Sequence, residues 1–89
     1  PVKRVAICGG AGGFLLGEAI RRDAQVFVTS DIKYHEFFDA DGQIVLADIG
    51  HYESEQFTID LLYDIVSDKF STFALHKTSV RTNPVNYLV

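Results

Sequence analysis

The sequence contains no methionine and only one cysteine, Cys8. A single cysteine excludes a disulfide bond within the chain and is compatible with the reducing cytoplasm, which is the location that we expect. The chain begins at Pro1 without an initiator methionine. We therefore expect these residues to be a piece of a larger protein.

The sequence also lacks basic clusters and long apolar runs. Its eight lysines and arginines are scattered along the chain, and the formal net charge is -4. A nucleic-acid surface needs clustered basic residues to neutralise phosphates, so we do not expect nucleic acid as a partner. No apolar run approaches the roughly 20 residues that span a bilayer, and no signal-peptide pattern opens the chain. We expect no membrane partner either.

The pattern of apolar residues predicts one α/β domain over residues 1–89. Short continuous apolar runs predict strands at residues 2–8, 25–29 and 44–49. Apolar residues at helical spacing predict helices at residues 14–22, 31–40 and 52–69. This alternation is typical of a mostly parallel sheet with helices packed on it, whose first strand is covered on both faces. A further strand is predicted at residues 71–80, with a short edge piece at 86–89, and this last part of the sheet is the candidate for an antiparallel strand.

A glycine-rich stretch, Gly9–Gly13, follows the first predicted strand. Backbone N–H groups in such a turn can approach a phosphate. The spacing departs from both common nucleotide motifs, because Leu15 stands where the dinucleotide fingerprint has glycine and Glu18 stands where the P-loop has lysine. A tight turn with close backbone packing is the other interpretation.

Two further stretches, Asp31–His35 and His51–Glu55, follow the second and third predicted strands. The carboxyl ends of parallel strands share one edge of a sheet, so all three loops are expected to converge there. His51 and Glu55 are four residues apart, which places them side by side on the first turn of a helix, where one metal ion could bind both. The other interpretation is an acidic helix start with His51 as a polar cap. For His35, a hydrogen-bonded, partly buried histidine is the alternative to a functional role.

Four motifs in order carry a resemblance to a known family: CGGAG at residues 8–12, VTSDIKYH at 28–35, GHYESE at 50–55 and TNPV at 82–85. Together they resemble the C-terminal portion of the dinuclear-metal family called GTP cyclohydrolase I type 2-like, or NGG-interacting-factor-like. The family usually has Thr-Gly-Asp where this chain has Thr29, Ser30 and Asp31. Because serine has a more restricted φ than glycine, we expect the turn at Ser30 to differ slightly.

The resemblance implies that His51 and Glu55 are metal ligands and that His35 lies close to the centre as a catalytic residue. It implies two divalent ions, for which histidine and carboxylate ligands suit Zn, Mn or Fe. The remaining ligands, an adjacent His-His pair and an aspartate, belong to an N-terminal half of the same protein, and no His-His pair occurs in these 89 residues. The resemblance also implies a homo-oligomer and a nucleotide substrate. We expect the isolated chain to bind metal weakly and to be inactive.

Three functions therefore remain open. The first is part of a metal-dependent hydrolase, in which His35 transfers a proton or orients the substrate. The second is a non-catalytic metal-binding or protein-interaction module. The third is a nucleotide-binding module that uses Gly9–Gly13.

Overall fold

A computed structural model describes residues 1–88. The chain divides into two compact units, Pro1–Glu55 and Gln56–Val89, which are described separately below. No helix within the described residues combines the length and the hydrophobicity that crossing a membrane requires.

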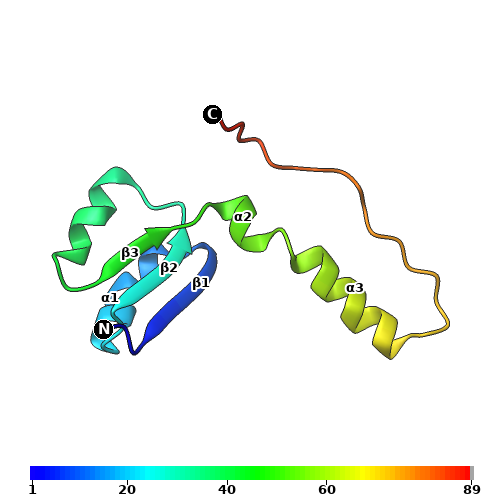
Figure 1. Ribbon diagram of the computed structural model, residues 1–89, viewed down its shortest axis with the longest axis horizontal. Coiled ribbons are helices and arrows are strands. Elements are labelled where there is room, and N and C mark those ends of the chain that lie inside the picture. The colour runs from blue at the N-terminus through cyan, green and yellow to red at the C-terminus, as the bar shows by residue number, and fades with distance from the viewer. Residues whose placement is uncertain (89) are drawn as a thin grey trace. The chain divides into compact units, whose positions relative to one another are not determined.

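The N-terminal unit is built on a three-stranded sheet in the order β1-β2-β3 (Figure 1). The strands are β1 (Val5–Ala11), β2 (Val26–Ser30) and β3 (Val45–Asp48). Both pairings are parallel, as the alternation of strands and helices predicted. β1 extends further than the sequence suggested, because Gly9, Gly10 and Ala11 belong to the strand rather than to a turn. The register is irregular between Ile7 and Ala11, which is where this glycine-rich end departs from the regular ladder.

Helices of both types connect and follow the strands. They are the 3-10 helices η1 (Gly13–Leu15) and η2 (Tyr34–Ala40) and the α-helices α1 (Leu16–Arg21), α2 (His51–Glu55) and α3 (Thr58–Lys69). The α/β class is confirmed, but the helix predicted over residues 52–69 is broken between α2 and α3. The Ser54 hydroxyl donates a hydrogen bond of 2.8 Å to the carbonyl oxygen of His51. Such a bond competes with the regular helical pattern and favours a bend or an end at this position.

The core of this unit lies on one face of the sheet. Phe27 is 2% exposed and faces α1, and its neighbours in register are Ala6 on β1 and Leu46 on β3. The opposite face carries exposed Val5, Ile7 and Val45. The elements of this unit therefore do not cover β1 on both faces as predicted. The buried cluster draws on both connections of the sheet, α1 and η2, as expected when successive right-handed crossovers lie on the same side.

The C-terminal unit consists of α3 and the segment that follows it. Residues 74–88 contain no regular secondary structure, so the strand predicted at 71–80 and the antiparallel last strand are wrong. A strand needs a hydrogen-bonded neighbour, and this segment packs along a helix instead. Lys77 forms an ion pair of 3.1 Å with Asp60 and lies 4.8 Å from the ring centre of Tyr63, both on α3. Val89, part of the predicted edge piece, lies outside the described residues.

Candidate metal site

The carboxyl edge of the sheet brings two carboxylates to the ring of His51. Asp31 follows β2 directly, and His51 is the first residue of α2, which follows β3. The Nδ1 atom of His51 lies 2.6 Å from Oδ2 of Asp31, and its Nε2 atom lies 3.2 Å from Oε2 of Glu55. All three side chains are about half exposed. The predicted pairing of His51 with Glu55 therefore forms, and Asp31 occupies the other side of the ring.

Asp48 holds the two segments of the site together. One oxygen of its carboxylate accepts a 3.2 Å hydrogen bond from the N–H of Ile32, and the other accepts a 3.1 Å bond from the N–H of Gly50. These donors are adjacent in sequence to Asp31 and His51. Asp31 itself has a positive φ of 56°, a conformation that aspartate tolerates better than most residues. The backbone on both sides of the Asp31–His51 contact is thus fixed by one side chain.

The backbone of Gly10 packs directly against α2. Its φ is 68°, and a β-carbon at this position would lie 2.7 Å from Oε1 of Glu55 and 3.3 Å from the ring of His51. Its N–H donates a 3.1 Å hydrogen bond to the hydroxyl of Ser54. Only a residue without a side chain leaves room for the pair at this position, so the glycine-rich end of β1 has a packing role at the site.

The carbonyl oxygen of Gly10 is anchored to β2 by two hydroxyls. It accepts a 3.1 Å hydrogen bond from Thr29 and a second, short one from Ser30, and both of these residues are fully buried. Ser30 lies within β2, and the positive φ falls on the next residue, Asp31. Serine is therefore accommodated here without a left-handed backbone, and its hydroxyl adds an anchor that glycine lacks.

The electrostatic surroundings of His51 favour its protonated form in the metal-free protein. The hydrogen bond to Asp31 raises the pKa of His51 most, partial desolvation lowers it by less than this bond raises it, and the negative charges of Asp31 and Glu55 raise it further. A metal ion requires a deprotonated ring nitrogen, so binding at His51 would release a proton.

The positions of His51 and Glu55 fit two ligands of one divalent ion. With bonds of about 2.0–2.2 Å, two adjacent ligands of an octahedral or tetrahedral ion lie about 3.0–3.4 Å apart. The observed separation of Nε2 and Oε2 is 3.2 Å. At this distance His51 and Glu55 also form an ion pair when the ring is protonated. No group of three or more His, Cys, Asp or Glu side chains that could hold a metal is found within residues 1–88. The described residues thus provide two candidate ligands, His51 and Glu55, and the carboxylate of Asp31, which contacts the other nitrogen of the His51 ring.

His35 is the third residue that the sequence predicted for this site. It is exposed on η2, and it does not join His51 and Glu55 in a three-donor group among the described residues. The residue from this segment that contacts His51 is Asp31, which the sequence reasoning did not single out. Its position immediately after a strand was the available signal, since that strand is the neighbour of the one preceding His51.

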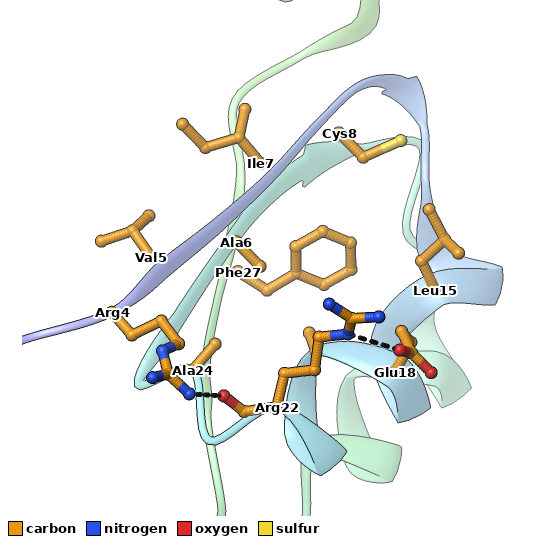
Figure 2. A pocket seen from close by; sticks show the side chains of 11 residues that line it. Arg4, Val5, Ala6, Ile7, Cys8, Leu15, Glu18, Arg22, Ala24 and Phe27 are labelled. Carbon is orange, nitrogen blue, oxygen red and sulfur yellow. Dashed lines mark hydrogen bonds and ion pairs between the residues drawn. The ribbon is translucent and has the colours of Figure 1, made fainter.

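A hollow of about 260 Å³ lies between β1 and α1 (Figure 2). Its lining is mainly apolar and includes Phe27, Leu15 and Cys8. The charged groups at its rim are engaged, because Arg22 pairs with Glu18 at 2.6 Å and the guanidinium of Arg4 donates to the carbonyl oxygen of Arg22. This hollow lacks the convergent titratable groups of the His51 site, so the carboxyl edge of the sheet is the candidate site.

Comparison with known proteins identifies the family of this chain. The family model of Duf34/NIF3 (NGG1p interacting factor 3) matches residues 1–84. The chain belongs to this family. A relative from Campylobacter jejuni, named GTP cyclohydrolase 1 type 2 homolog, is 46% identical over 57 residues, which are 63% of this chain and 22% of the relative. A Staphylococcus aureus protein of the same name is 36% identical over 92 residues, 98% of this chain and 25% of that protein.

The structure of this chain is also similar to solved structures. A crystal structure of Staphylococcus aureus protein SA1388 matches with a TM-score of 0.75 at 33% identity, over 98% of this chain and 30% of that chain. The present chain spans about a quarter of the length of the curated relatives that it matches.

Proposed function

We propose that this chain supplies two ligands, His51 Nε2 and the Glu55 carboxylate, to a divalent metal centre in a Duf34/NIF3 protein with hydrolase activity. The observation that carries the proposal is the 3.2 Å separation of these two atoms at the carboxyl edge of the parallel sheet. Gly10 supports it, because the absence of a side chain there leaves space for the His51 ring and the Glu55 carboxylate.

The proposed centre holds two ions of Zn, Mn or Fe and takes its other ligands from an N-terminal half of the same protein. When bound, these ions would supply positive charge to polarise a substrate bond and a nucleophile at neutral pH. In this proposal His51 and Glu55 hold the metal, while His35, which is exposed on η2, transfers a proton or orients the substrate. We propose a homo-oligomer in the cytoplasm as the working form.

GTP is the first substrate to test, because the curated relatives are named GTP cyclohydrolase 1 type 2 homologs. The chemical class that we propose is a nucleotide or another phosphate ester. In this assignment a His35→Gln variant retains its bound metal and loses turnover, since His35 acts on the substrate and not on the ion.

Metal content of the complete protein tests the ligand assignment. We expect His51→Ala and Glu55→Ala each to lower the bound metal per chain. His76→Ala and Asp68→Ala are the matched controls, because both residues are exposed in the C-terminal unit, and their metal content should equal that of the wild type. Unchanged stoichiometry in His51→Ala and Glu55→Ala would contradict the proposal.

A non-catalytic metal-binding or interaction module is the second candidate, favoured by the family description as an interacting factor. Assays of the metal-loaded complete protein with GTP and simple phosphoesters separate the two functions, because a module of this kind binds metal without turnover above background. Nucleotide binding by Gly9–Gly13 is less well supported. The N–H of Gly10 is already bonded to Ser54, so it is not available to a phosphate.

A further inference from the structure

We infer that Asp31 is the positioning residue of this site: it holds a proton on Nδ1 of His51 and thereby leaves Nε2 as the atom that faces the metal. The inference rests on the proposed function and extends it to a residue that is itself no ligand. The geometry around the ring, the backbone at Asp31 and the chemistry of metal-bound histidine each support it.

The ring of His51 lies between two carboxylates that are not equivalent. Asp31 is 2.6 Å from Nδ1, and Glu55 is 3.2 Å from Nε2. A neutral imidazole has one N–H and one lone pair, so only one carboxylate can keep a hydrogen bond when the ring loses its second proton. The shorter, charge-assisted bond is the one that persists. The lone pair then lies on Nε2, next to the carboxylate of Glu55.

The two carboxylates also differ in how firmly they are held. Asp31 has a short side chain on a backbone fixed by the end of β2 and by the Ile32–Asp48 hydrogen bond of 3.2 Å. Glu55 has a longer side chain with more rotamer freedom and stands at the end of α2. The rigid group suits the task of orienting the ring, and the flexible one suits the task of adjusting to an ion.

In many metal sites a carboxylate accepts a hydrogen bond from the ring nitrogen that a metal-binding histidine does not use for the metal. It selects the tautomer, fixes the plane of the ring and raises the basicity of the ligand nitrogen, and its loss typically lowers metal affinity about 10- to 100-fold. We expect a loss of that size when the carboxylate of Asp31 is removed.

The backbone at Asp31 determines which variants are informative. Its φ of 56° disfavours alanine, whereas glycine adopts this conformation freely, so Asp31→Gly removes the carboxylate without straining the chain. Asp23 and Asp41 have similar φ values of 58° and 46°, and the carboxylates paired with the His51 ring are those of Asp31 and Glu55 instead. Asp23→Gly and Asp41→Gly therefore report the backbone effect of the same substitution elsewhere.

The first measurement uses the metal-free complete protein with ¹⁵N-labelled histidine, at a pH where the rings are neutral. The signals of the His51 ring are assigned by their loss in a His51→Gln variant. We expect the His51 ring to be protonated at Nδ1 in the wild type, Asp23→Gly and Asp41→Gly, and to become a mixture of tautomers in Asp31→Gly. An Nε2-protonated ring in the wild type, or no change in Asp31→Gly, would overturn the inference.

The second measurement is the affinity for Zn²⁺ by competition with a chelator. We expect Asp31→Gly to bind about 10- to 100-fold more weakly and the two control variants to bind like the wild type. An unchanged affinity in Asp31→Gly would also overturn the positioning role. If the wild type binds no metal through His51 and Glu55, the proposed function fails, while the tautomer measurement still decides what Asp31 does to the ring.

Discussion

The backbone of Gly10 lies so close to Glu55 that a β-carbon on it would come within 2.7 Å of Oε1. This contact joins the end of β1 to the proposed ligand on α2. The glycine-rich stretch of the sequence therefore has its role in the packing of the site, and several properties of the site depend on it.

Replacing Gly10 with alanine should weaken both the fold and the metal site. Alanine at a φ of 68° costs about 1–2 kcal/mol, and its methyl group must also displace Glu55 or His51. Gly42→Ala is the matched control, since Gly42 has the same φ of 68° with nothing within 4 Å of an added β-carbon. We expect both variants to unfold at lower urea concentration, but only Gly10→Ala to lose Zn²⁺ affinity. Equal affinities in the two variants would mean that Gly10 does not shape the site.

The two hydroxyls on the Gly10 carbonyl should behave as a coupled pair. Thr29→Val or Ser30→Ala removes one donor and leaves the other, so each should lower the free energy of unfolding by about 1 kcal/mol. The double variant leaves a buried carbonyl without either donor, and its loss should exceed the sum of the single losses by about 0.5 kcal/mol or more. Urea unfolding of all four proteins checks this, with the exposed Ser71→Ala as the control. Simple additivity would argue against a shared acceptor.

The stability of the metal-free protein should fall as pH rises past neutrality. Asp31 and Glu55 raise the pKa of His51 above its ordinary value of 6.5. A raised pKa in the folded state contributes stability that is fully present below about pH 6.5 and is lost as pH increases through the folded value. We expect the difference in urea midpoint between wild type and His51→Gln to shrink from pH 6 to pH 9, and to be smaller throughout in an Asp31→Asn background. A difference that does not vary with pH would contradict the raised pKa.

Much of this arrangement can be predicted from the sequence, because it depends on local patterns. Short apolar runs such as that ending at Cys8 predict parallel strands, and the loop after the third strand is predicted at the carboxyl edge of the sheet, where His51 and Glu55 lie in the structure. The partner of His51 depends instead on the register of β2 against β3, in which Thr29 lies opposite Asp48. That register aligns Asp31 with the turn before α2, and it cannot be read from either strand alone.

The other differences between the predicted and the observed elements also result from contacts between residues that the local sequence pattern does not reveal. The apolar spacing of residues 52–69 fits one helix, yet the hydroxyl of Ser54 bonds both to His51 and to Gly10 and the helix is interrupted after Glu55. The alternation near Leu75 fits a strand, yet this segment packs beside Ile59 and Leu62 on α3. Periodicity indicates which side chains are buried but does not identify the surface that buries them.

The most direct test of the proposed centre is an anomalous-scattering map from crystals of the complete protein grown with Zn²⁺ and measured on both sides of the zinc edge. We expect a peak about 2.0–2.2 Å from both Nε2 of His51 and a carboxylate oxygen of Glu55, with Asp31 still bonded to Nδ1. A zinc peak that contacts neither His51 nor Glu55, or that has replaced Asp31 at Nδ1, would contradict the assignment of these residues.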